Sequence, residues 1–270
     1  MLSWQIGAVK ITCVVEMVIP LPKGSFLRDA TAEALKTSPW LFPHFAKEDG
    51  TLIASVQALL VEAPELRPVV DTCIGNDKRR NLTGGNPLAT PFLQHLADAG
   101  WSRDSVDAVI CTHLHVDHVG WNTMLVDGKW VPTFPKARHL IGKREFEHWS
   151  RESNEEQRAI FGDSVRPIFD AGLVELVETD HRISPELRLT PPPGHTPGHV
   201  SVMIQLEGQS AVITGDIAHH PCQMAHPEWA TGYDSDTQGA AATRAKLSPN
   251  GPTSRSWSSA PTMPRRPLDM

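Results

Sequence analysis

The chain has 270 residues, and 25 lysines and arginines against 31 aspartates and glutamates give a formal charge of −6. This mildly acidic balance, with no long basic run, argues against nucleic acid as the main partner. No apolar stretch is long enough for a transmembrane helix, so we expect no membrane partner. Hydrophobic residues make up 40% of the chain, which is enough for a packed core and excludes global disorder.

The N-terminal segment 1–22 is apolar only in places, because Lys10 and Glu16 interrupt it, and we expect a strand there rather than a signal peptide. Four cysteines lie far apart and form no CxxC pair, namely Cys13, Cys73, Cys111 and Cys222. This spacing favours free thiols in a reducing compartment over disulfides or a thiolate metal site. The expected location is therefore the cytoplasm.

Hydrophobic periodicity predicts strands first, then strands mixed with helices. In chain order we expect strands at 8–21, 52–63 and 67–74, a helix at 91–100, strands at 106–112 and 137–141, a helix at 143–151, and strands at 187–190, 200–206 and 211–214. This order predicts a sheet-rich α/β sandwich with covering helices in one domain, residues 1–247.

The last 23 residues differ from the rest of the chain. Residues 248–270 contain five prolines and five serines and show neither helical nor strand periodicity. We expect a Pro/Ser-rich tail there that is disordered or out of frame.

The strongest chemical signal is the run Thr112-His113-Leu114-His115-Val116-Asp117-His118, which begins where a short buried strand ends. Residues two apart in extended backbone point the same way, so His113 and His115 are expected to face one cavity. Asp117 and His118 follow in the turn. One segment thus supplies three imidazoles and a carboxylate, which suit one or two metal ions of borderline softness.

Two later elements carry residues of the same kind. The run Pro193-Gly194-His195-Thr196-Pro197-Gly198-His199 is a tight loop that presents His195. Thr214-Gly215-Asp216 ends an apolar strand, and a carboxylate such as Asp216 has enough lone pairs to bridge two cations.

The HxHxDH run, the GHTPGH loop and the strand-terminal TGD, in this order, resemble the metallo-β-lactamase superfamily over roughly residues 8–245. The resemblance implies an αββα sandwich. It also implies that His113, His115 and His195 hold a first metal, that Asp117 and His118 hold a second, and that Asp216 bridges them. Two Zn²⁺ ions are expected for the family, with iron or manganese as alternatives.

Two further histidines fall near these motifs. The resemblance gives His199 a supporting role rather than a ligand role. Lactonases of the family often have a tyrosine three residues after the bridging aspartate, and here that position is His219. We expect His219 to contact substrate, the alternative being a packed or solvated loop histidine.

Members of the family usually have one more histidine after a final strand, yet no histidine follows His226 in this chain. The resemblance therefore implies an incomplete second metal site and a lost C-terminal strand and helix. Codon choices exist under which the residues from Ser248, read one frame over, give an apolar strand and a histidine. We hypothesise that the tail is an out-of-frame extension, the alternative being a genuine Pro/Ser-rich tail.

The resemblance implies a metal-dependent hydrolase that uses a metal-bound hydroxide to open a lactone, ester or related bond in a small-molecule substrate. Asp117 and Asp216 would orient this hydroxide and carry its proton. The alternatives are an iron-dependent oxidoreductase or dioxygenase on the same scaffold, and an inactive truncated member. A homodimer is compatible with the sequence. Six aromatic residues either line an apolar pocket or belong to core and surface, namely Trp40, Phe42, Phe45, Trp121, Trp130 and Phe134.

Overall fold

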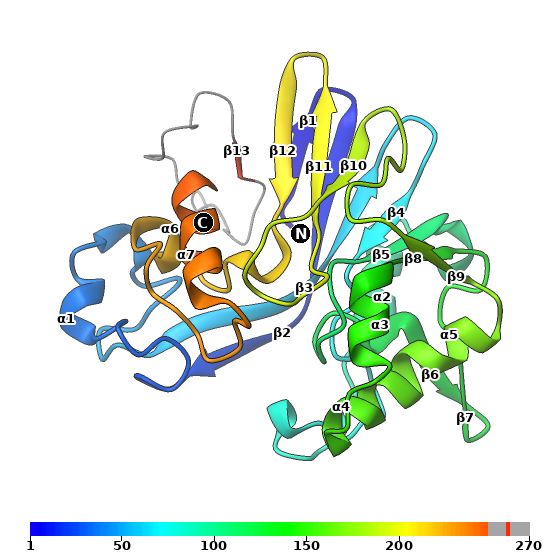
Figure 1. Cartoon of the computed structure of the whole chain (residues 1–270), viewed down its shortest axis with the longest axis horizontal. Helices are drawn as coiled ribbons and strands as arrows, with labels where there is room; N and C mark the ends of the chain where they lie inside the picture. Colours follow the sequence, from blue (N-terminus) through cyan, green and yellow to red (C-terminus); the bar gives the residue numbers. More distant parts are fainter. Residues whose placement is uncertain (248–257, 260–270) are drawn as a thin grey trace.

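Two β-sheets packed face to face form the centre of the molecule, and helices cover the outer face of the larger sheet (Figure 1). The computed structural model describes residues 1–247 and 258–259. The layering follows from the strands, whose buried apolar residues have to be covered on both faces of the larger sheet.

The larger sheet has seven strands. In spatial order they are β1 (Ser3–Ile6), β2 (Val9–Leu21), β3 (Leu52–Glu62), β4 (Pro68–Val70), β5 (Ala108–Cys111), β8 (Arg138–Gly142) and β9 (Val174–Val177). The first four pair antiparallel, and β4, β5, β8 and β9 pair parallel. The carboxyl ends of β4 and β5 therefore lie at the same edge, where the polar segments after each strand meet.

The smaller sheet is β10 (Leu187–Thr190), β11 (Ser201–Leu206), β12 (Gln209–Ile213) and the two-residue β13 (Ser258–Ser259). β10, β11 and β12 pair antiparallel, whereas β13 pairs parallel with β12. A separate hairpin is formed by β6 (Thr123–Val126) and β7 (Lys129–Pro132).

The helices are short. The α-helices are α1 (Ala32–Leu35), α2 (Phe92–Asp98), α3 (Lys143–Trp149), α4 (Glu155–Ile160), α5 (Arg166–Asp170), α6 (Cys222–Ala225) and α7 (Thr237–Leu247). A π-helix, η5 (Phe161–Val165), joins α4 to α5. The 3₁₀ turns are η1 (Pro39–Leu41), η2 (Asn81–Thr83), η3 (Arg103–Ser105), η4 (Gly120–Asn122) and η6 (Gly215–Ile217).

Three apolar clusters hold these layers together. One lies between the sheets and joins residues such as Ile11 and Val61 to Val202 and Ile213. A second lies on the other face of the larger sheet, under α2 and the α4–η5–α5 segment. A third packs α1 and η1 against α6. Because the two faces of β3 contribute to different clusters, a one-residue slip in its pairing would move each of its side chains into the opposite cluster.

The structure confirms an α/β sandwich and most of the predicted elements. The strand predicted at 67–74 is shorter, because Asp71 adopts a left-handed conformation (φ 57°) and ends β4 at Val70. Elements that the periodicity did not predict include α1, the β6–β7 hairpin, the α4–η5–α5 segment, β9, α6 and α7.

The predicted tail lies outside the described residues, except for Ser258 and Ser259, whose strand was not predicted. Its out-of-frame origin and the boundary at residue 247 therefore stay predictions. Within residues 1–247, none of the helices combines the length and the hydropathy needed to cross a membrane.

Burial of His139 in β8 predicts that the fold loses stability in acid. Burial lowers the pKa of this imidazole to about 4, whereas an unfolded chain has a histidine pKa of about 6.5. The folded state thus excludes a proton, so its stability is full above pH 6.5 and falls as the pH drops towards 4. This one group should remove about 3 kcal/mol over that range.

The His139→Leu variant should show a shallower loss of unfolding free energy between pH 7 and 4, measured by urea titration with a chelator present. The exposed His148 serves as a control, because His148→Leu should keep the wild-type slope. Equal slopes for wild type and His139→Leu would contradict the prediction.

Candidate metal centre

The HxHxDH segment lies at the carboxyl end of β5, beside the end of β4. The Asp71 carboxylate, which follows β4, accepts hydrogen bonds from the Thr112 amide (2.8 Å) and the Thr112 hydroxyl (2.9 Å). The same carboxylate accepts a hydrogen bond from His118 Nδ1 at 2.9 Å. Thr112 Oγ1 in turn lies 3.1 Å from His113 Nδ1. Asp71 thereby holds the outer nitrogens of two histidine rings and leaves their inner nitrogens facing the centre.

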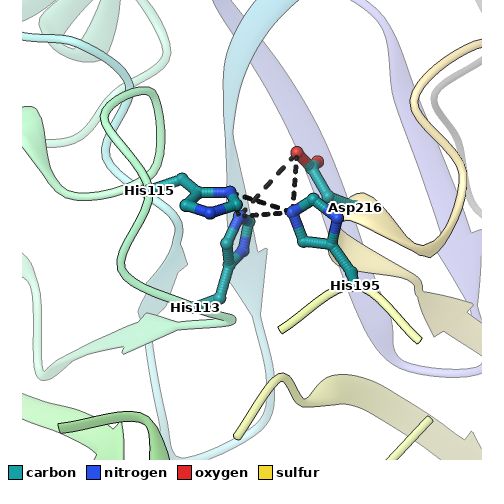
Figure 2. A group of neighbouring side chains, drawn as sticks. All are labelled: His113, His115, His195 and Asp216. Atoms are coloured by element: carbon teal, nitrogen blue, oxygen red, sulfur yellow. Dashed lines mark hydrogen bonds and ion pairs between the residues drawn. The ribbon is translucent and has the colours of Figure 1, made fainter. Parts of the chain in front are cut away.

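Three imidazole nitrogens converge where the HxHxDH segment meets the loop of His195 (Figure 2). His113 Nε2 lies 3.0 Å from His115 Nδ1, and His195 Nε2 lies 2.9 Å from His115 Nδ1 and 3.2 Å from His113 Nε2. Asp216 Oδ2 closes the group at 3.8 Å from His113 Nε2 and 3.7 Å from His195 Nε2. We call this group the three-histidine site.

A second group shares Asp216 and contains Asp117 and His118. His118 Nε2 lies 3.2 Å from Asp216 Oδ2 and 3.7 Å from Asp117 Oδ1. We call it the carboxylate site. All six residues predicted as metal ligands are therefore brought together, and Asp216 stands between the two groups.

Burial sets the charge state of the three-histidine site. Burial, reinforced by the neighbouring imidazoles, lowers the pKa of both His113 and His115 well below the ordinary value. Both rings are therefore neutral, which is the form that binds metal. Burial likewise lowers the pKa of His118, but the carboxylates of Asp216, Asp71 and Asp117 outweigh it, and the net shift is upward.

The pKa values of the two carboxylates of the centre, Asp117 and Asp216, shift in opposite directions. Burial raises the pKa of Asp117. Burial also acts to raise the pKa of Asp216, but His118 and His219 outweigh it and hold that pKa well below the usual range. Asp216 is thus the permanently charged member of the pair, as expected of a group between two cations.

The donor set of the three-histidine site fits a divalent ion. The three ring nitrogens lie 2.9–3.2 Å apart with their lone pairs facing one another. They carry too few protons to hydrogen-bond to one another. A tetrahedral zinc at about 2.0–2.1 Å from each nitrogen requires separations of about 3.3 Å. Imidazole and carboxylate also suit iron and manganese. Among the described residues, the carboxylate site offers three protein groups, one fewer than a closed tetrahedral site.

Glu145 of α3 joins the two histidine loops, a role that the sequence pattern did not reveal. Its carboxylate accepts hydrogen bonds from the amides of Leu114 (3.1 Å) and Gly198 (3.0 Å) and from the Thr196 hydroxyl (2.8 Å). It also accepts one from Trp149 Nε1. Because Glu145 is almost fully buried, each of these donors offsets the cost of burying its charge.

The remaining predicted histidines differ in their surroundings. His199 Nε2 accepts a hydrogen bond from the Asp216 amide at 3.1 Å, which confirms its predicted place beside the ligands. His219 Nε2 lies 3.5 Å from Asp216 Oδ2, and neither His219 ring nitrogen has a hydrogen-bond partner among the described residues. Burial lowers the pKa of His219 to about 4, so its ring is neutral.

A cavity of about 140 Å³ opens beside the centre. Asp117, His118, Asp216 and His219 line one part of it, and apolar side chains line the rest, among them Ile19, Leu21, Phe26, Val56, Leu59 and Ile213. Within the described residues, none of the six aromatic side chains considered for a pocket lines this cavity. Trp121 and Phe134, for example, are buried in the core behind the larger sheet.

The fold and the site together define an α/β sandwich with a histidine- and aspartate-rich centre at its strand ends. The sequence profile of the metallo-beta-lactamase superfamily matches residues 54–252. The chain belongs to this superfamily.

Individual relatives agree with this assignment. A Bacillus sp. N-acyl homoserine lactonase is 24% identical over 142 residues, which are 52% of this chain and 50% of the relative. The chain thus spans about half the length of the curated relatives it matches. Among solved structures, hydrolase AbOPH of the beta lactamase superfamily is 26% identical with a TM-score of 0.70, covering 90% of this chain and 83% of that one.

The fold of this chain is also that of AidC, a dizinc quorum-quenching lactonase solved with the product N-hexanoyl-L-homoserine. The TM-score is 0.71 at 22% identity, covering 90% of this chain and 84% of that one.

The close approach of two backbone segments beside the centre predicts a strong effect of a small substitution. Gly120 N donates to Cys73 O at 2.7 Å, and a Cβ on Gly120 would overlap the carbonyl of Ile74. Gly120→Ala should lower the unfolding free energy by about 3 kcal/mol and weaken zinc binding, because it forces the His118 segment away from Asp71.

Gly162 is the matched control, because no atom lies within 4 Å of a Cβ placed there. Gly162→Ala should change stability by less than about 1 kcal/mol. Urea unfolding and zinc titration of the two variants test this prediction. Similar unfolding free energies and zinc affinities for both variants would contradict it.

Proposed function

We propose that this chain is a metal-dependent hydrolase that opens a lactone, ester or related bond. The observation that carries the proposal is the convergence of the His113, His115 and His195 nitrogens with Asp216, a residue that also lines the cavity. The relatives named above, which include N-acyl homoserine lactonases, support the same class of reaction.

His113, His115 and His195 would hold one ion, and Asp117 and His118 would contribute to a second, with Asp216 between them. A divalent ion bound there supplies Lewis-acid activation of water and of the scissile bond. Asp117 and Asp216 would orient the attacking water and carry its proton.

Zinc is the ion we propose, because three imidazoles and a carboxylate form a zinc-type ligand set. The second ion would be held less tightly, since the described residues give the carboxylate site three protein ligands. Four buried free thiols support a reducing compartment such as the cytoplasm.

His219 is proposed as a substrate-binding residue. Its neutral ring lines the cavity beside Asp216, and a ring nitrogen would donate a hydrogen bond to a substrate oxygen. The apolar wall around Phe26 would receive the hydrocarbon part of the substrate.

Removing one imidazole tests the metal centre. His113→Ala and His115→Ala should each lose tight zinc binding and reduce hydrolysis to background, because two remaining imidazoles and one carboxylate are too few for a closed site. Metal content after dialysis and turnover of chromogenic lactones, esters and phosphotriesters are the measurements. His148→Ala, at an exposed position, is the control.

Retained metal and turnover in either variant would contradict the site. Wild-type protein that binds iron and consumes oxygen, without hydrolysing any of these substrates, would point instead to oxidoreductase chemistry on the same ligands.

Substitution of His219 separates substrate contact from metal binding. His219→Phe should lower kcat/KM about 100-fold while metal content stays at the wild-type level, since a hydrogen bond to the reacting oxygen is lost. His219→Gln, which keeps a donor, should retain more activity. An unchanged kcat/KM in His219→Phe would show that the ring only packs in the cavity wall.

A further inference from the structure

Arg244 of α7 is fully buried although it carries a charge, and it stands among the largest fully buried side chains of the described residues. Its guanidinium donates hydrogen bonds to three backbone carbonyls, those of Pro227 (2.8 Å), Ile217 (3.0 Å) and Trp229 (3.1 Å). The fourth acceptor is Asp234 Oδ2 at 3.3 Å. One side chain thus ties α7 to η6 and to the loop between α6 and α7.

Asp234 connects this arginine to a predicted metal ligand. Its other oxygen, Oδ1, lies 3.1 Å from His195 Nδ1, and both side chains are completely buried. The backbone reinforces the contact, because Ser235 N donates to His195 O at 2.9 Å. A carboxylate in this position keeps the proton of His195 on Nδ1, so that Nε2 presents a lone pair to the three-histidine site.

Arg244 also reaches the bridging residue through the backbone. The carbonyl that it binds at Ile217 directly follows Asp216, whose carboxylate stands between the two metal sites. The guanidinium therefore acts on both sides of the three-histidine site: on His195 through Asp234, and on Asp216 through η6.

We propose that Asp234 and Arg244 are positioning residues that set the metal affinity of the three-histidine site. The proposal rests on the metal centre proposed above. Without Arg244, the buried Asp234 would lose its counter-charge and would no longer be held in position to bind the His195 ring. Without the Asp234 carboxylate, the His195 ring would lose the partner that selects its tautomer. No ligand is removed in either case, so the effect falls on affinity rather than on the number of ligands.

Asp234→Asn is the sharpest variant because it keeps the shape and removes the charge. His195 Nδ1 contacts Asp234 Oδ1 and Arg244 contacts Oδ2, so in asparagine one of these two donors must face the amide nitrogen. We expect the affinity for Zn²⁺, measured by competition with a chelator, to fall about 10- to 100-fold. The visible spectrum of the Co²⁺-loaded protein should change as well.

Arg244→Met should weaken Zn²⁺ binding at least as much, and Arg244→Lys should recover part of it, because lysine restores the charge but not the fork of donors. Should Arg244→Met not fold, Arg244→Lys carries the test. In the double variant Asp234→Asn/Arg244→Met the losses should not add, because both act through the same contact.

The control is another arginine–aspartate pair, formed by buried Arg80 and partly buried Asp163, whose side chains contact Ser164 rather than a predicted metal ligand. Asp163→Asn should lower thermal stability yet keep Zn²⁺ affinity within about twofold of wild type, as expected for a merely structural pair.

Nitrogen-15 NMR of the metal-free protein gives an independent readout. The His195 ring should carry its proton on Nδ1 in wild type and should show mixed tautomers in Asp234→Asn. Wild-type affinity and an unchanged tautomer in Asp234→Asn would overturn the proposal. Failure of the wild-type protein to bind Zn²⁺ would instead overturn the metal centre itself.

Discussion

Buried carboxylates hold the histidine loops of this protein in place. Asp71 accepts hydrogen bonds from Thr112 and His118, and Asp234 accepts one from His195. Glu145 accepts hydrogen bonds from the two loops that follow Thr112 and His195. A buried carboxylate is costly unless its lone pairs are satisfied. Each loop therefore has one arrangement in which the charge is compensated, and that arrangement turns the ring nitrogens inward.

The same charges explain why the centre suits a cation. His113 and His115 are neutral because protonation would bury positive charge beside other imidazoles. Asp216 stays ionised with His118 and His219 beside it. The site thus combines neutral nitrogen lone pairs with a permanent negative charge, and a divalent ion would satisfy both.

The two metal sites are unequal in this chain. The three-histidine site has four protein groups and a support that runs from His195 through Asp234 to Arg244. Among the described residues, the carboxylate site has three groups, of which only His118 is an imidazole. An ion in the three-histidine site would therefore be held by more donors, whose own positions are better supported.

The sequence by itself determined which histidines and aspartates would meet and which elements carry them. The signals are local patterns: histidines two apart after a buried strand, a loop fixed by Gly and Pro around His195, and a carboxylate at the end of an apolar strand. Local patterns are kept in the folded chain. The long strands β2 and β3 were predicted for the same reason, since their periodicity extends over many residues.

Only the tertiary structure decided how these pieces meet. Glu145, Asp234 and Arg244 lie in segments without a metal motif, and the backbone contact that admits only Gly120 joins segments far apart in sequence. The apolar cavity wall comes from β2, β3 and Phe26 rather than from the aromatic residues singled out in the sequence. Such roles arise from contacts between segments that are far apart in sequence, and no single segment of the chain encodes them.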